Sequence, residues 1–373
     1  MAGTLLLRAD AGPGIGAGHL MRCLALAQAW GEAGGRAVLA AAELAPALAA
    51  RAAREFDEVV AVAGRPGSRE DARATARIAR QGGAGWIVLD GYAFGDAYEE
   101  EAAGGGARLL ALDDCGHADH RCADAVLNQN LHATAALYPR RGPHTALLLG
   151  PRYCLLRREF RARPAPRRRP EGPARRVLVT FGGADPLGLT EEALEALALL
   201  PEAEALDCAV AVGGANPRAG SIARAAEAAP FRCRVHRDPP DLAALMAWAD
   251  LALTAAGSTC WELAHLGVPA AAVVVAENQI AHAQALAEAG TLCLVGRAGR
   301  LPREQWAEEI RKILGDPRAR ERMAHRGPAL VDGQGAVRVV EHLAGAGAEP
   351  IRPGPQAEPS AQGRRHRCYV SPN

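Results

Sequence analysis

Aromatic side chains and lysine are scarce in this chain of 373 residues. Phe, Trp and Tyr together make up 4% of the sequence, so its cores must be built from Ala, Leu and Val. Lys312 is the single lysine, and arginine carries nearly all of the positive charge. The net charge of +1 creates no overall field that would attract nucleic acid. We therefore expect no nucleic-acid partner.

Long hydrophobic runs and paired cysteines are absent too. No apolar stretch approaches the ~18 residues of a membrane span. Arg8 and Asp10 interrupt the N-terminal hydrophobic stretch before a secretion signal could form. The nine cysteines are scattered without a Cys-x-x-Cys pair, which is typical of reduced thiols. These features favour a cytoplasmic protein without a membrane anchor.

Short aliphatic runs alternate with amphipathic stretches along most of the chain. This alternation predicts α/β domains with parallel sheets, right-handed crossovers and functional loops at the carboxyl ends of the strands. The length fits two doubly wound, Rossmann-like domains facing a central cleft, which we place at residues 1–156 and 177–332, with a last helix over 333–344. Strands are expected at 4–8, 37–42, 58–63, 86–90, 109–113, 125–128, 145–149, 177–181, 209–212, 233–236, 251–254, 271–275 and 292–295.

Two segments break this alternation. Residues 157–176 contain nine arginines together with prolines, which oppose helix formation, so we expect an extended linker between the domains. A nucleic-acid-binding arm is the alternative, but the segment lacks interleaved aromatic residues. Residues 345–373 show no periodicity, and we expect this tail to be disordered.

Residues 9–23 (ADAGPGIGAGHLMRC) place several glycines between a predicted strand and a predicted helix. The glycines are Gly12, Gly14, Gly16 and Gly18. Such a loop lets backbone N–H groups approach an anion or a sugar beside the positive end of the helix. Two alternatives remain: a flexible turn, or a dinucleotide-binding fingerprint formed by Gly12, Gly14 and Ala17, with Glu43 closing the next strand.

His19 lies where the helix after this loop starts. The positive end of a helix disfavours imidazolium, so a neutral His19 would suit a general base near pH 7. Asp90 and Tyr92 follow another predicted strand at the same edge of the sheet, and we expect them to share the cleft with His19. The alternatives are a structural role for His19 and an ordinary turn in which Asp90 caps the next helix.

The segment 113–122 (DDCGHADHRC) has the composition of a metal site. Its possible ligands are Cys115, His117, His120 and Cys122. Zinc sites usually use Cys-x-x-Cys or His-x-x-x-His spacing, whereas the spacings here are Cys-x-His and His-x-Cys. We therefore expect a polar loop and no bound metal.

Two further glycine loops follow strands in the second half. Gly182 and Gly183, in TFGGAD, would face the first glycine loop across the cleft. Another strand leads into Gly257, Ser258 and Thr259. These three residues start a helix, which is a natural seat for a diphosphate. Glu262 lies four residues after Ser258 on the same helix face and could accept both ribose hydroxyls, while Asn278 and Gln279 open the following helix.

Seven segments, taken together, carry a family resemblance. They are RADAGPGIGAGHLMRCLALA, LDDCGHADHRCADAVLNQNL, LLGPRYCLLRREF, VLVTFGGADP, GSTCWELAHLGVP, AENQ and DGQGAVRVVEHL. With them the sequence resembles the hydrolases of pseudaminic acid biosynthesis that cleave UDP-2,4-diacetamido-2,4,6-trideoxy-β-L-altropyranose, over about residues 4–344. That family is related to the peptidoglycan N-acetylglucosaminyltransferase and to spore-coat polysaccharide proteins. The resemblance implies a GT-B fold.

The resemblance also implies a mechanism and a site. Water would attack the anomeric carbon with inversion and release UDP, without a cofactor or an obligatory metal. His19 would be the catalytic base, and Tyr92 would position water or sugar. Uridine diphosphate would be held by Gly257, Ser258, Thr259, Glu262, Asn278 and Gln279. Pro13 and the arginine-rich linker depart from the family and could mark a branch with a different sugar.

Three other functions suit the same architecture. A GT-B glycosyltransferase would pass the sugar to an acceptor alcohol and would be expected to show an apolar or basic acceptor patch, which the first half does not display. A hydrolysing UDP-sugar 2-epimerase would use carboxylates near the sugar, for which Asp90, Asp113 and Asp114 are formal candidates. A non-catalytic sugar-nucleotide-binding protein would bind UDP and release nothing.

Overall fold

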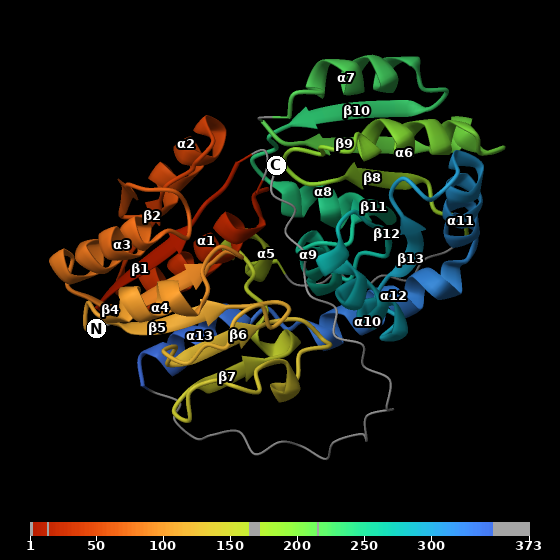
Figure 1. Ribbon diagram of the computed structural model, residues 1–373. Helices are drawn as coiled ribbons and strands as arrows, with labels where there is room; N and C mark the ends of the chain where they lie inside the picture. The colour runs from red at the N-terminus through yellow and green to blue at the C-terminus, as the bar shows by residue number, and fades with distance from the viewer. Residues whose placement is uncertain (1–2, 13–14, 164–171, 215, 346–373) are drawn as a thin grey trace.

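The chain forms two α/β domains that lie side by side (Figure 1). The computed structural model describes residues 3–12, 15–163, 172–214 and 216–345. The expectations for Gly14, for the middle of the arginine-rich segment and for the tail from residue 346 lie outside the described residues. The predicted fold class, two doubly wound parallel-sheet domains of GT-B type, is confirmed.

A seven-stranded parallel sheet forms the first domain, in the order β3-β2-β1-β4-β5-β6-β7. Its strands are β1 (Thr4–Ala9), β2 (Arg36–Ala41), β3 (Glu58–Ala61), β4 (Ala84–Asp90), β5 (Arg108–Leu112), β6 (Ala125–Asn128) and β7 (Ala146–Leu149). Central strands are covered on both faces, which explains why β1 is aliphatic almost without interruption. The strand order reverses between β1 and β4, so the loops after these two strands border the point where such sheets bind ligands.

A six-stranded parallel sheet forms the second domain, in the order β10-β9-β8-β11-β12-β13. Its strands are β8 (Arg176–Thr180), β9 (Asp207–Val212), β10 (Arg232–Arg237), β11 (Leu251–Ala255), β12 (Ala270–Val274) and β13 (Cys293–Arg297). The order reverses here between β8 and β11. Every predicted strand of both domains is present, with its ends displaced by at most two residues.

Helices cover both faces of the two sheets. In the first domain they are α1 (Gly18–Glu32), α2 (Pro46–Glu55), α3 (Arg69–Gln81) and α4 (Asp96–Ala103), with short 3₁₀ turns η1 (Ala135–Leu137) and η2 (Pro151–Tyr153). In the second they are α6 (Leu189–Ala198), α7 (Ala219–Ala228), α8 (Leu242–Trp248), α9 (Thr259–His265), α10 (Ile280–Glu288), α11 (Arg303–Gly315) and α12 (Pro317–Leu330), with η3 (Ala203–Ala205) and η4 (Glu277–Gln279). Within the described ranges, none of these helices has the length and apolar character needed to cross a bilayer.

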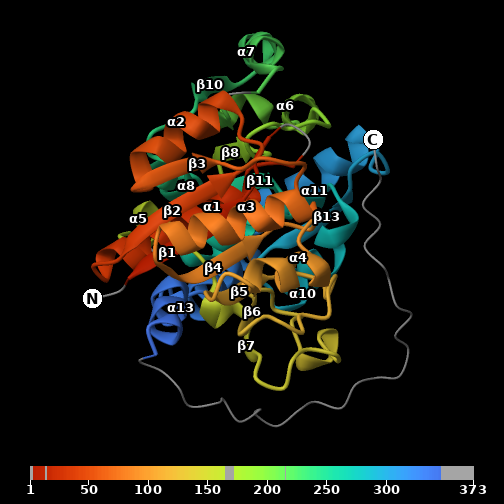
Figure 2. The ribbon, with the colours of Figure 1, turned by 60° about the vertical axis from the view of Figure 1, so that its left-hand side comes forward.

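The last helix, α13 (Gly335–Leu343), returns to the first domain and packs beside its sheet (Figures 1 and 2). Val339 and Leu343 are buried in the hydrophobic cluster that contains β1 and α1. The Trp86 indole Nε1 donates a hydrogen bond to the Leu343 carbonyl over 2.9 Å. The sequence predicted this helix but not the domain that it completes.

The arginine-rich segment is not wholly extended, contrary to the prediction. Residues 158–161 form one helical turn, α5 (Arg158–Arg161), before the prolines begin. Its arginines are paired with acids from other elements: Arg158 and Arg161 both bind Glu32 of α1. Charge repulsion among the arginines is therefore offset in this part of the segment, and Phe160 is buried in the core of the second domain.

Candidate active site

Loops from the two sheets meet where the carboxyl ends of their strands face each other. A Cβ atom added to Gly183, after β8, would lie 3.8 Å from the Ala17 Cβ atom, just before α1. Gly182 adopts a positive φ of 82°, which a glycine permits without strain. Gly16 has the same φ of 82°, and its N–H donates to the Gly12 carbonyl over 2.7 Å. The two predicted glycine loops are thus neighbours across the domain interface.

His19 is buried in the first turn of α1 and is held by Asp90 at the end of β4. Its Nδ1 lies 2.6 Å from the Asp90 Oδ1. The Arg22 Nη2 also lies 3.0 Å from this Nδ1, but it donates to the Asp90 Oδ1 over the shorter distance of 2.6 Å. Since a carboxylate only accepts hydrogen bonds, the close contact with Asp90 favours the tautomer with its proton on Nδ1. In that tautomer Nε2 of a neutral ring has a free lone pair. The predicted alternative in which Asp90 caps a helix is wrong, because α4 starts after Gly95 and Asp90 binds side chains instead.

Arg22, one turn after His19 on α1, completes this arrangement. Its Nη2 donates to the Asp90 Oδ1 over 2.6 Å and its Nε donates to Oδ2 over 3.0 Å. Its Nη1 reaches the Asp114 Oδ2 at 2.6 Å. Burial would raise the pKa of Asp90, but the charge of Arg22 and the hydrogen bonds from His19 and Arg22 keep it below its usual range, so the carboxylate stays ionised. Arg22 is not among the predicted site residues, although its i+3 spacing from His19 places both side chains on one helix face.

Tyr92 links the site to the second domain. Its hydroxyl oxygen accepts a hydrogen bond from the Asn278 Nδ2 over 2.7 Å, and the hydroxyl lies 3.4 Å from the Asp114 Oδ2. The Tyr92 ring meets the His19 ring edge-on, with the centroids 5.3 Å apart. Burial and the neighbouring Asp114 raise the pKa of Tyr92, so its hydroxyl remains protonated at neutral pH. Two residues predicted for separate ends of the site, Tyr92 and Asn278, are therefore in direct contact.

The segment 113–122 forms a hydrogen-bonded polar loop. Asp113 Oδ1 accepts the Cys115 and Gly116 backbone N–H groups, and Oδ2 lies 2.7 Å from the His120 Nε2. Asp113, Cys115 and His117 bring one potential ligand atom each within 4.8 Å of one another. Both oxygens of Asp113 also take part in the hydrogen bonds of this loop.

His120 is fully buried between two carboxylates. Its Nδ1 lies 2.6 Å from the Glu99 Oε1, opposite the Asp113 contact at Nε2. Burial would lower the pKa of His120, but the two carboxylates raise it to about 9. The imidazolium thus locks the loop to α4 and supports the His117 ring, which packs edge-on against Tyr92 at 5.8 Å between centroids.

The predicted diphosphate seat lies between β11 and α9. Ser258 caps α9 without a side-chain hydrogen bond to the backbone, and Thr259 starts the helix. A Cβ atom on Gly257 would lie 3.6 Å from the Gln279 Nε2, so these two predicted residues are adjacent. Gln279 is oriented by its own Oε1, which accepts the Val275 N–H over 3.0 Å. Loops after β11 and β12 therefore converge as expected.

Glu262 is buried on α9 and binds an arginine that the sequence placed in the linker. Its Oε1 accepts from the Arg157 Nη2 over 2.9 Å. Arg157 could not be singled out from the sequence, because a segment with nine arginines gives no sign of which one is buried.

Two residues of the first glycine loop remain to be placed. Gly18 opens α1 directly before His19. Glu43, the acid of the dinucleotide-binding alternative, lies against Gly12 of the first loop.

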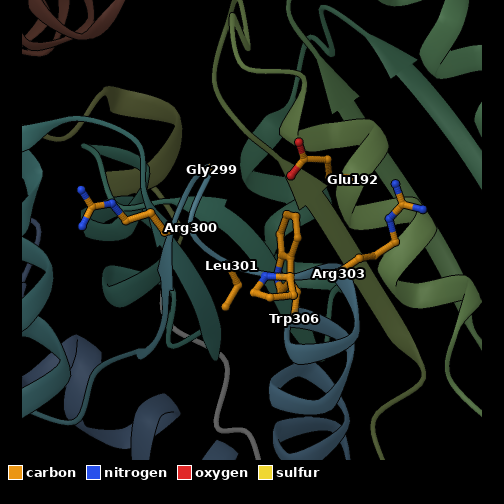
Figure 3. Close-up of a pocket in the computed structure, with 7 residues that line it drawn as sticks. Glu192, Gly299, Arg300, Leu301, Arg303 and Trp306 are labelled. Atoms are coloured by element: carbon orange, nitrogen blue, oxygen red, sulfur yellow. The ribbon is translucent and has the colours of Figure 1, made fainter.

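A separate cavity of about 470 Å³ opens beside α11 and α6 (Figure 3). It is lined by Glu192, Gly299, Arg300, Leu301, Pro302, Arg303 and Trp306. None of the predicted site residues lines it. Arg303 turns toward α6, where it pairs with Glu195, so part of its charge is already balanced.

Comparisons with known proteins agree with this architecture. Residues 177–336 match the model of the glycosyltransferase family 28 C-terminal domain. The spore coat polysaccharide biosynthesis protein SpsG of Bacillus subtilis (strain 168) is 29% identical over 237 residues, which are 64% of this chain and 69% of that protein.

Solved structures share the fold at low sequence identity. The MurG structure from Acinetobacter baumannii is 17% identical with a TM-score of 0.63, and the match covers 92% of this chain and all of that one. A UDP-GlcNAc 2-epimerase from Neisseria meningitidis, solved with UDP-GlcNAc bound, is 13% identical with a TM-score of 0.60, again over 92% of this chain and 100% of that chain. At such identities the likeness describes the arrangement of the two domains.

Proposed function

We propose that the protein hydrolyses a UDP-linked deoxy-diacetamido sugar to the free sugar and UDP, as an enzyme of nonulosonic acid biosynthesis. The proposal is supported by the match of the second domain to a glycosyltransferase domain model and by the spore-coat polysaccharide relative. The observation that carries it is the 2.6 Å contact between the His19 Nδ1 and the Asp90 Oδ1. This contact favours the tautomer with the proton on Nδ1, in which Nε2 would serve as the base.

In the proposed reaction, His19 Nε2 accepts a proton from water while the water oxygen attacks the anomeric carbon. The bond from that carbon to the diphosphate oxygen breaks, and its electron pair leaves with UDP. Attack opposite the leaving group inverts the anomeric configuration. Asp90 stabilises the imidazolium that forms, since it is ionised and already bound to Nδ1.

The leaving group explains why one base suffices. Glycosidases acting on alkoxide leaving groups need a second carboxyl group as an acid. UDP spreads its charge over two phosphates, and the backbone N–H groups of Ser258 and Thr259 would stabilise that charge. Asn278 would place Tyr92 against the sugar or the attacking water, because the two side chains are bonded over 2.7 Å.

The carboxylates of the first domain favour hydrolysis over 2-epimerisation. A base near the sugar C2 needs an oxygen that is free to accept a proton. Asp90 is held by His19 and Arg22, and Asp113 is saturated within its own loop. Asp114 receives Arg22 and the Asn130 Nδ2 at 3.2 Å. The imidazole of His19 is then the best placed base.

The decisive experiment incubates the purified protein with UDP-linked 2,4-diacetamido-2,4,6-trideoxy sugars and UDP-GlcNAc, without an acceptor, and measures UDP release. We expect release from a diacetamido sugar, and a loss of at least about 100-fold in kcat for His19→Asn, as for removal of a general base. His144→Asn, which changes an exposed histidine before β7, should keep the wild-type rate.

Each negative result has its own meaning. UDP release that appears only with an acceptor alcohol would indicate a transferase. Native activity in His19→Asn would remove the base assignment. Hydrolysis in ¹⁸O-labelled water should put the label in the sugar; label in UDP would contradict attack at the anomeric carbon.

A further inference from the structure

Arg157 is a buried arginine at the junction of the two domains. It leaves the first domain just after η2 and lies directly before the α5 turn. Its Nη2 donates to the Glu262 Oε1 over 2.9 Å, and its Nη1 donates to the Glu159 Oε1 over 2.6 Å. Burial would lower the pKa of Arg157, but these carboxylates raise it, so the guanidinium is charged.

The arginine is fixed by more than its ion pairs. Its guanidinium carbon lies 4.8 Å from the centroid of the Phe160 ring, a cation–π distance. Phe160 is fully buried in the cluster that contains Trp261 and Leu263 of α9. Arg157 is therefore anchored to the same helix from which Glu262 projects, and its position is coupled to that helix.

Glu262 is held on one side and open on the other. Oε1 is bound by Arg157, whereas no hydrogen bond to Oε2 is found among the described residues. The side chain keeps 12% of its surface exposed, and the Gly257–Thr259 loop precedes it by less than two helical turns. A sugar hydroxyl next to a diphosphate in that loop would meet the open side of this carboxylate.

We propose that Arg157 is a positioning residue that presents the Glu262 carboxylate to the ribose hydroxyls and so makes the nucleotide seat selective for ribose. This inference rests on the proposed function, because it takes the Gly257–Thr259 loop as the diphosphate seat. Arg157 does not touch the nucleotide itself. It holds the Glu262 carboxylate in one rotamer, so that the hydroxyls bind without first reorganising that side chain.

The test compares the dissociation constants of UDP and 2′,3′-dideoxy-UDP by isothermal titration calorimetry. Wild type should prefer UDP by about tenfold or more, the contribution of one charge-assisted hydrogen bond. Arg157→Met keeps most of the volume and removes the charge; we expect UDP to bind about tenfold more weakly and dideoxy-UDP to bind unchanged. Arg157→Lys should recover part of the preference, because it restores a cation beside Glu262.

Two further variants control for folding and for the partner. Arg158→Met alters the adjacent arginine, whose exposed side chain pairs with Glu32, and should leave both affinities unchanged. Glu262→Gln should lose the same preference as Arg157→Met, and the double variant should lose no more than either.

The possible outcomes separate this inference from the function it rests on. If wild type binds neither nucleotide, the proposed function and the inference both fail. If wild type binds UDP but shows no ribose preference, or if Arg157→Met weakens both nucleotides equally, only the inference is overturned. A purely structural Arg157 would produce the last pattern.

Discussion

Single residues carry most of the chemistry, and His120 is the clearest case of a charge that the fold creates. A histidine without neighbours is mostly neutral at pH 7, but here Glu99 and Asp113 flank it in the absence of solvent. The resulting imidazolium packs against the His117 ring, which in turn packs against Tyr92. Its protonation should therefore be visible in the stability of the whole domain.

We predict that this proton stabilises the folded state by about 3 kcal/mol, from a pKa of about 9 against 6.5 when unfolded. A raised folded pKa gives a contribution that is complete below pH 6.5 and is lost as the pH rises through about 9. Urea unfolding at pH 6 and pH 10 measures it. The cysteines also titrate in this window, so the comparison is with His120→Asn, in which this part of the pH dependence should vanish. An identical pH dependence in both proteins would contradict a charged His120.

Site residues that lie in a recognisable motif after a strand could be predicted from the sequence. Site residues whose role depends on their buried partners could not. His19 and Tyr92 follow strands beside glycine loops, so topology alone brings them to one edge. Arg157 and Arg22 are ordinary arginines in sequence. Their roles depend on which carboxylates are buried with them, Glu262 and Asp90, and this is set by packing between distant segments.

At the scale of elements, strands were predictable because each is a short aliphatic run buried on both faces. Local sequence could not show which domain α13 covers, since an amphipathic helix fits any apolar face. Helix α12 follows α11 directly as a separate helix. It begins where the Asp316 side chain accepts the Ala319 N–H over 2.9 Å.

We predict that Leu343→Ala destabilises the first domain by about 2–5 kcal/mol, because it empties a fully packed position of α13. Glu341→Ala, two residues earlier on the exposed face, is the matched control and should cost less than about 0.5 kcal/mol. Hydrogen exchange measures where the loss falls. Faster exchange should appear in β1 and β4 and not in β11; equal acceleration in β11 would mean that α13 does not stabilise the first domain selectively.

At the scale of the whole molecule, one hydrogen bond between side chains connects the two domains beside the candidate active site. The bond between Tyr92 and Asn278 joins loops after β4 and β12, directly beside His19. Because each side chain orients the other, their contributions to activity should depend on each other.

We predict that Tyr92→Phe and Asn278→Ala each lower kcat/KM for the UDP-sugar by about 10- to 100-fold. The kcat/KM of the double variant should be no lower than that of the less active single variant. The double-mutant cycle is measured with the same UDP-release assay. Fully additive losses would show that the two residues act independently, and so that the interdomain bond has no role in the reaction.

The return of α13 to the first domain has a consequence for synthesis on the ribosome. All seven strands of the first sheet emerge before residue 150, but the helix that closes its core emerges nearly two hundred residues later. During that interval the nascent domain exposes an apolar strip over β4 and α1, which only the finished polypeptide covers. Folding of the N-terminal half is therefore completed after translation of the C-terminal half. A chain terminated before α13 would keep this apolar surface exposed and would be prone to aggregation and to chaperone binding.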